Sequence, residues 1–209
     1  VQLNQQALVC AREYRYALAW PTVFLGLVAF TGYWALLFLV IFKQLSLLLA
    51  IPLMAILIYA AYTVLHEAVH YCISGNIKSL RWLNDGIGYL AATILLTGLV
   101  VHRYEHLKHH RNVNNGSKDP DQYSAHIVSS LGSMLKSCRT AIAGQYTTYM
   151  ADRRDQAPPR QNIVMVLEIA LAIGLRALPF ALLSAFGDAG IQGRWVEGLI
   201  ALVASGLAG

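Results

Sequence analysis

The stretch ALAWPTVFLGLVAFTGYWALLFLVIF, residues 17–42, contains no charged side chain. After Lys43 a second uncharged stretch follows, QLSLLLAIPLMAILIYAAYTVL at 44–65. A helix needs about 20 mostly apolar residues to cross the ~30 Å hydrocarbon core of a bilayer, and each stretch is long enough. The first is also too long and too uniformly apolar for a cleavable signal peptide. The two stretches therefore predict a pair of membrane-spanning helices joined by a short turn.

The composition agrees with a membrane protein. Of 209 residues 56% are hydrophobic and 13% are charged, whereas soluble domains carry about 25% charged residues. Of 16 lysines and arginines, 11 lie between His66 and Arg160, which predicts that this part faces the cytoplasm. The same charge pattern is ordinary for a cytoplasmic face, so we expect no nucleic acid partner. The scattered Cys10, Cys72 and Cys138 are typical of free thiols in a reducing compartment.

A shorter apolar segment, IGYLAATILLTGLVV at 87–101, falls short of the length needed to cross the membrane. If it crossed, His66 and His70 would lie on the opposite face from the histidines at 102–110 and could not meet them. We therefore expect this segment to be re-entrant, interfacial or packed against the bundle.

The remaining segments complete the predicted fold. Residues 127–150 are predicted to form an amphipathic helix on the membrane surface, and 151–160 a polar linker. A third membrane helix follows at 163–186, and a fourth at 195–209 begins at Trp195. The sequence thus predicts an all-α, multi-pass membrane helix bundle of four transmembrane helices, the last incomplete, with a cytoplasmic histidine-rich cap. We expect one domain over residues 1–209. Because the chain begins at Val1 and stops inside an apolar run, we also expect a fragment whose C-terminal part is missing.

Histidines concentrate in two places. HRYEHLKHHR at 102–111 holds four of the seven, and HEAVH at 66–70 holds two more with i, i+4 spacing. At 100° per residue, the four imidazoles of the first stretch fall inside a 100° arc of a helix, with Lys108 and Arg111 on the opposite side. Neutral imidazole is the commonest metal ligand in proteins. A site rich in histidine and poor in carboxylates suits zinc, copper or iron, and two clusters suggest two ions.

HEAVH at 66–70 and HLKHH at 106–110 resemble the first two histidine boxes, HxxxH and HxxHH, of the membrane fatty acid desaturase/hydroxylase superfamily. The stretches RWLND at 81–85 and HHRNVNNGSKDPD at 109–121 resemble the segments that follow those boxes. The resemblance implies that two iron ions (Fe²⁺/Fe³⁺) are the cofactors and O2 the co-substrate. The iron ligands that it implies are His66, His70, His106, His109 and His110.

The implied reaction is O2-dependent desaturation of a fatty acyl chain within a membrane lipid or acyl substrate. The chain has no flavin, haem or GxGxxG motif, so electrons would come from a separate donor of the ferredoxin, cytochrome b5 or reductase type. The third HxxHH box of the family is missing, since no histidine follows His126. We attribute this to truncation and expect the fragment alone to be inactive.

Three alternatives stay open. The first is a carotenoid ring hydroxylase or ketolase, or another lipid hydroxylase of the same superfamily. The second is an HExxH membrane zinc metalloprotease with Glu67 as the general base and NDG at 84–86 as the distant ligand motif. The third is a non-enzymatic metal-binding or transport protein.

Some polar residues have two interpretations each. His102 lies outside the box pattern but shares the imidazole face, so it is either a neighbour of the ligands or a ligand itself. Glu168 and Arg176 lie within an apolar segment, where ionisable groups are functional candidates. They could instead pair with each other, or Arg176 could reach the interface. Asp119 and Asp121 either orient imidazoles or form a solvated turn. Further residues match family-like positions without a derivable role: Asn84, Asp85 and Asn114.

Overall fold

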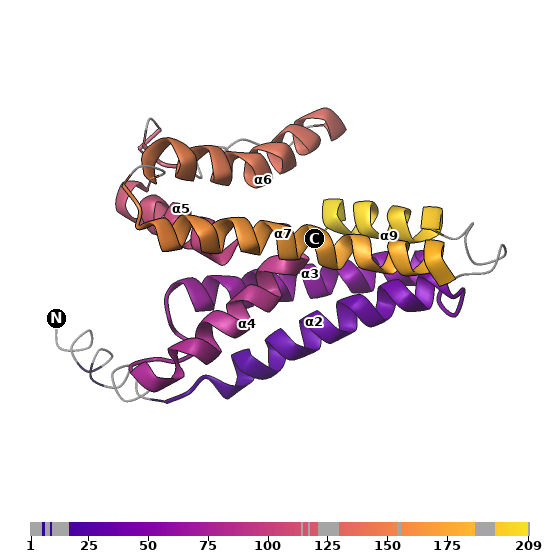
Figure 1. Cartoon of the computed structure of the whole chain (residues 1–209), viewed down its shortest axis with the longest axis horizontal. Helices are drawn as coiled ribbons and strands as arrows, with labels where there is room; N and C mark the ends of the chain where they lie inside the picture. The colour runs from indigo at the N-terminus through magenta and orange to yellow at the C-terminus, as the bar shows by residue number, and fades with distance from the viewer. Residues whose placement is uncertain are drawn as a thin grey trace.

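A computed structural model describes Gln6, Val9 and residues 17–113, 115–116, 118–120, 130–153, 156–186 and 195–208. This described part consists of helices and their connections, without a strand (Figure 1). The elements are α2 (Trp20–Ile41), α3 (Leu47–Val69), the short 3₁₀ helix η1 (Lys78–Leu80), α4 (Arg81–Ile94), α5 (Leu99–Asn112), α6 (Leu131–Arg153), α7 (Pro159–Phe186) and α9 (Trp195–Ala208).

The predicted hairpin is present as α2 and α3, which have 22 and 23 residues. Lys43 in the turn between them adopts a positive φ of 56°. Pro52 lies inside α3, but the helix continues through it to Val69. The apolar part of α3 therefore leads without interruption into the HEAVH segment, and His66 lies on its last turn.

The main core lies where α2, α3, α4 and α9 pack together. Its largest fully buried side chains include Tyr33, Leu37, Met54 and Leu65. At Gly88 of α4 an added Cβ would lie 2.7 Å from the Cβ of Ala68, so the glycine permits the close approach of α4 to the end of α3. The outward faces are also apolar, with Phe24, Leu48 and Ile56 exposed over 68%, 84% and 64% of their surface. Such a surface fits contact with lipid rather than water.

The segment predicted at 87–101 is not one element. It straddles a break at residues 95–98, where α4 and α5 meet at 94° and Leu96 has a positive φ of 54°. Asn84 in the first turn of α4 and His106 in the second half of α5 both contact the end of α3, through Ala68 and His70. The pair therefore turns inside the bundle and leads back to the histidine end, as Figure 1 shows. This shape fits the expected re-entrant segment, and we call α4 and α5 the re-entrant pair; its position relative to a membrane stays a prediction.

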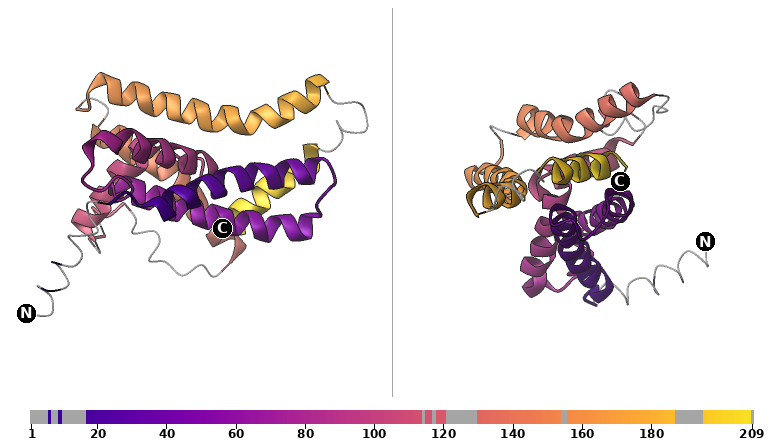
Figure 2. Two further views of the ribbon diagram at one scale, coloured as in Figure 1. Left: turned by 90° about the horizontal axis from the view of Figure 1, so that it is seen from below. Right: turned by 90° about the vertical axis from the view of Figure 1, so that its right-hand side faces the viewer.

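The second half of the chain lies around this core. α6 packs on α5, where Tyr149 is fully buried against Tyr104 with 5.7 Å between ring centroids. The predicted linker at 151–160 is shorter than expected, since α6 extends to Arg153 and α7 begins at Pro159. α7 packs against α4 and α5, to one side of the α2–α3 hairpin, whereas α9 packs directly on that hairpin (Figure 2). The placement of α6 on a membrane surface stays a prediction.

The fold class is confirmed. Within the described residues, three helices are long and apolar enough to cross a membrane, namely α2, α3 and Pro159–Ala181 of α7. The number would be four only if α4 and α5 crossed together as one bent span instead of re-entering. α9 is apolar, but its 14 described residues are shorter than a full crossing.

Candidate metal centre

Four histidines from two helices converge where the end of α3 meets α5. One ring nitrogen from each of His66, His70, His106 and His110 lies within 4.8 Å of all the others. The Nε2 of His106 lies 3.1 Å from that of His70 and 2.9 Å from that of His110. The two histidine clusters of the sequence thus form one site, although 36 residues separate His70 from His106.

The four nitrogens fit a metal ion. Imidazole nitrogens bind metals at about 2.0–2.1 Å, so two that bind one ion at right angles lie about 3.0 Å apart. Burial, and to a lesser degree repulsion from the surrounding imidazoles, lowers the pKa of His106 to about 3. The pKa of His70 is also lowered, again mainly by burial. Both rings are therefore neutral at physiological pH and have a lone pair available for a metal.

His109 lies beside this cluster rather than in it. Its Nδ1 lies 2.7 Å from Oδ1 of Asp119, and its ring centroid is 5.6 Å from that of His110. Asp119 is buried, so it orients an imidazole and is not part of a solvated turn. A carboxylate on one ring nitrogen fixes the ring and leaves the other nitrogen for a metal. Asp121 and Asn114 lie outside the described residues.

His102 lies one turn below the cluster and is buried. Its ring is nearly parallel to that of His106, at 5.7 Å, and meets Tyr62 edge-on at 6.2 Å. Gln145 is a neighbouring polar side chain, but neither ring nitrogen of His102 makes a hydrogen bond of good geometry. Burial lowers the pKa of His102 to about 4. The structure therefore places His102 as a packing neighbour of His106, outside the group of four.

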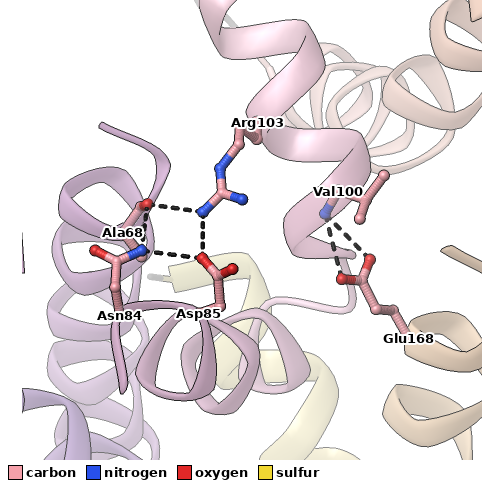
Figure 3. Close-up of polar contacts among 6 residues, drawn as sticks. All are labelled: Ala68, Asn84, Asp85, Val100, Arg103 and Glu168. Carbon is pink, nitrogen blue, oxygen red and sulfur yellow. Dashed lines mark hydrogen bonds and ion pairs between the residues drawn. The ribbon is translucent and has the colours of Figure 1, made fainter. Parts of the chain in front are cut away.

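The end of α3 is tied to α4 and α5 by a network around one carbonyl (Figure 3). The carbonyl oxygen of Ala68 accepts hydrogen bonds of 3.0 Å from Nδ2 of Asn84 and from Nη2 of Arg103. Arg103 also pairs with Asp85 at 2.7 Å. Carbonyls in the last turn of a helix lack helical partners. That of Ala68 also accepts from the backbone N–H of Tyr71 at 3.2 Å, and two neighbouring helices supply the further donors. Asn84 and Asp85 thus hold the helices together. The protease alternative would require this segment to reach the histidines, and it does not.

Sequence reasoning missed Tyr71, which directly follows His70. Its φ is 59°, a backbone conformation that residues other than glycine rarely adopt. The guanidinium groups of Arg81 and Arg103 lie over its ring at 4.1 Å and 4.2 Å from the centroid. These contacts hold the backbone next to His70. No local sequence pattern around Tyr71 predicts these contacts, because both arginines belong to later helices. Glu105, buried on α5 next to the imidazole face, was also missed.

Glu168 and Arg176 of α7 do not pair with each other, so the alternative that they form a pair is wrong. Both oxygens of Glu168 accept from the backbone N–H of Val100, at 3.1 Å and 3.3 Å. Arg176 donates to the backbone carbonyls of Thr93 and Ile94 instead of reaching the interface. The two residues thus bind opposite sides of the break between α4 and α5.

A cavity of about 320 Å³ lies between α4, this break and α7. Its lining is mostly apolar, with Ala92, Val164, Leu167 and Leu171, and it carries polar groups from Thr97 and Glu168. Leu167 and Leu171 are exposed over 61% and 51% of their surface on the outer face of α7. The cavity is therefore bordered by side chains that face lipid.

Most of the chain matches a known protein family. A family model described as fatty acid desaturase matches residues 43–207, which include both histidine clusters and the helices that carry them. Neither a comparison with curated proteins nor one with solved structures found a match.

Proposed function

The chain belongs to the fatty acid desaturase family, and from this we propose that it is an O2-dependent fatty acyl desaturase whose di-iron centre lies where α3 meets α5. The observation that supports the proposal most strongly is the convergence of four imidazoles from the end of α3 and from α5. His66, His70, His106 and His110 would hold one iron. His109, oriented by Asp119, would contribute to the second, which needs ligands beyond these five histidines.

Iron held by these histidines would supply the activation of O2 that removal of hydrogen from an unactivated C–H bond requires. Desaturation takes two hydrogens from the acyl chain and two electrons with two protons from a donor, and it reduces O2 to two waters. Other residues of this chain hold the histidines in position. Asn84 and Arg103 fix α3 against α4 and α5, and Asp119 sets the orientation of His109.

The cavity between α4 and α7 is the proposed place for part of the acyl chain. Its apolar lining and its border with lipid suit a hydrocarbon chain that enters from the membrane. From Gly98 at the base of α5 to His106 the helix rises about 12 Å, at about 1.5 Å per residue. The cavity therefore suits the portion of the chain beyond the reacting carbon.

The histidine end of the bundle is proposed to face the cytoplasm, where a separate electron donor would reach it. The charge distribution of the sequence supports this orientation, since Lys78, Arg111 and Lys118 are exposed at this end. The donor would be of the ferredoxin, cytochrome b5 or reductase type.

The proposal is tested by expressing the complete gene that contains this sequence together with a ferredoxin and its reductase, and by analysing the lipids of the host. We expect new double bonds in acyl chains that require O2 and disappear in the His106→Ala variant. Hydroxylated acyl chains or oxidised carotenoid rings would instead assign the chain to the related oxygenases. Zinc in the site, with peptide cleavage and no O2-dependent change in lipids, would refute the proposal in favour of a protease.

A further inference from the structure

α7 carries two ionisable side chains, Glu168 and Arg176, in its apolar membrane-spanning part, where burying a charge costs free energy. Glu168 is 8% exposed, and Glu168 and Arg176 are both within the apolar length of a membrane-spanning helix. Ionisable groups in such segments are rare and have specific partners. They do not pair with each other. Both bind the backbone of the re-entrant pair, on either side of residues 95–98, and Tyr33 of α2 also lies beside Arg176.

Each side chain satisfies backbone groups that the break leaves open. The first N–H groups of α5 have no helical partner, and the residue before the helix, Gly98, offers no side-chain cap. Glu168 supplies the missing acceptor to Val100. At the other side Arg176 donates to the carbonyls of Thr93 and Ile94 at the end of α4. The acid thus lies at a helix N-terminus and the base at a helix C-terminus, which is the favourable match to both helix dipoles.

The direction of α5 determines where its histidines lie. From Val100 to His110 the helix is about 15 Å long at about 1.5 Å per residue. A tilt of about 5° at its base would therefore move His110 by more than about 1 Å, whereas a metal site tolerates errors of about 0.5 Å. α5 carries His106, His109 and His110, while His66 lies in the last turn of α3 and His70 is the residue that caps it. Small changes at the break would thus separate one half of the site from the other.

We propose that Glu168 and Arg176 are positioning residues for the metal centre: from α7 they hold both sides of the helix break and set the direction in which α5 presents its histidines to α3. The inference rests on the proposed function in one respect, namely that the histidines of α5 bind metal. Neither residue touches the metal or the reacting atoms.

The test uses the full chain purified into lipid nanodiscs, with Co²⁺ as the probe. Co²⁺ affinity is measured by competition with a chelator, coordination geometry by visible absorption, and the break by hydrogen exchange of residues 95–105. The variants are Glu168→Ala, Glu168→Gln and Arg176→Met. The matched controls are Glu197→Gln on α9 and Arg160→Met at the start of α7, since neither residue lies at the break.

We expect Glu168→Ala and Arg176→Met to lower Co²⁺ affinity about 10- to 100-fold, the usual effect of losing a group that orients ligands. Their visible spectra should change and residues 95–105 should exchange faster. Glu168→Gln keeps an acceptor for Val100 and should lose less affinity, and both controls should match the wild type. If the folded variants bind Co²⁺ with the affinity and spectrum of the wild type, the positioning role is refuted while the metal centre stands. If the wild type binds no Co²⁺, the proposed function fails, and this role fails with it.

Discussion

Oδ1 of Asp119 makes a hydrogen bond of 2.7 Å with Nδ1 of His109, which leaves Nε2 as the nitrogen available to a metal. In Asp119→Asn an amide replaces the carboxylate, so the hydrogen bond loses its charge and the ring is held less firmly. We expect metal affinity to fall by about 10-fold or more. Iron competition with a chelator measures this, with Glu197→Gln on α9 as a control that removes an acid away from the histidines. Equal affinities for the wild type and Asp119→Asn would contradict the orienting role.

Tyr71 stabilises the end of α3 through the face of its ring. Cation–π contacts contribute about 0.5–2 kcal/mol each, and two arginines share this ring at 4.1 Å and 4.2 Å. We therefore expect Tyr71→Leu to lower the free energy of unfolding by about 1–2 kcal/mol, measured as a lower Tm in lipid nanodiscs. Tyr71→Phe keeps the aromatic face and should remain close to the wild type. If both variants lose the same stability, the hydroxyl and not the ring is the stabilising group.

At the scale of residues, spacing along a helix predicts which histidines can share a site but not how each is held. Helical spacing singles out the pair at 66 and 70 and the four imidazoles within 102–110, and the resemblance to the desaturase superfamily selects five of these six as candidate ligands. The supporting contacts of Asn84, Arg103 and Glu168 could not be predicted, because their partners are 16, 35 and 68 residues away. Local sequence carries no information on such contacts without the packing of the helices.

Among the elements, long apolar stretches predict the membrane helices well, since length and composition alone separate them from soluble helices. α2, α3 and α7 begin and end within a few residues of the predicted bounds. The break within 87–101 could not be located in this way, because apolar residues continue through it and no proline marks it. Its cause is tertiary: α7 supplies hydrogen-bond partners to both sides of the break.

Gly98 connects the break to α7. Its φ is −107°, which other residues adopt freely, but an added Cβ would lie 2.5 Å from Oε2 of Glu168. Gly98→Ala should therefore push Glu168 away from Val100 and lower metal affinity about as much as Glu168→Ala does. Gly174→Ala on α7 is the matched control, because its Cβ would meet nothing within 4 Å. Metal titration checks both variants, and unchanged affinity in Gly98→Ala would show that the contact is dispensable.

For the whole molecule, the re-entrant pair decides which residues share a membrane face. Cys72 and Arg111 are exposed at the histidine end of the bundle, and Lys43 is exposed in the turn at the other end of the α2–α3 hairpin. In a background with the native cysteines replaced by serine, single cysteines at 72, 111 and 43 can be labelled with a membrane-impermeant thiol reagent. We expect the first two to react from the cytoplasmic side and the third from the opposite side. Labelling of 111 together with 43 would contradict the re-entrant arrangement.

The bundle joins two histidine clusters that are separate in the sequence, and the proposed activity depends on metal bound where they meet. The most direct measurement is the iron content of the purified protein, by elemental analysis, for the wild type and for His106→Ala. His106 is the central residue of the four, within 3.1 Å of both His70 and His110, so we expect iron in the wild type and its loss in the variant. Arg111→Ala, an exposed change on the same helix, should keep its iron. Zinc in place of iron in the wild type, or undiminished iron in His106→Ala, would contradict the account.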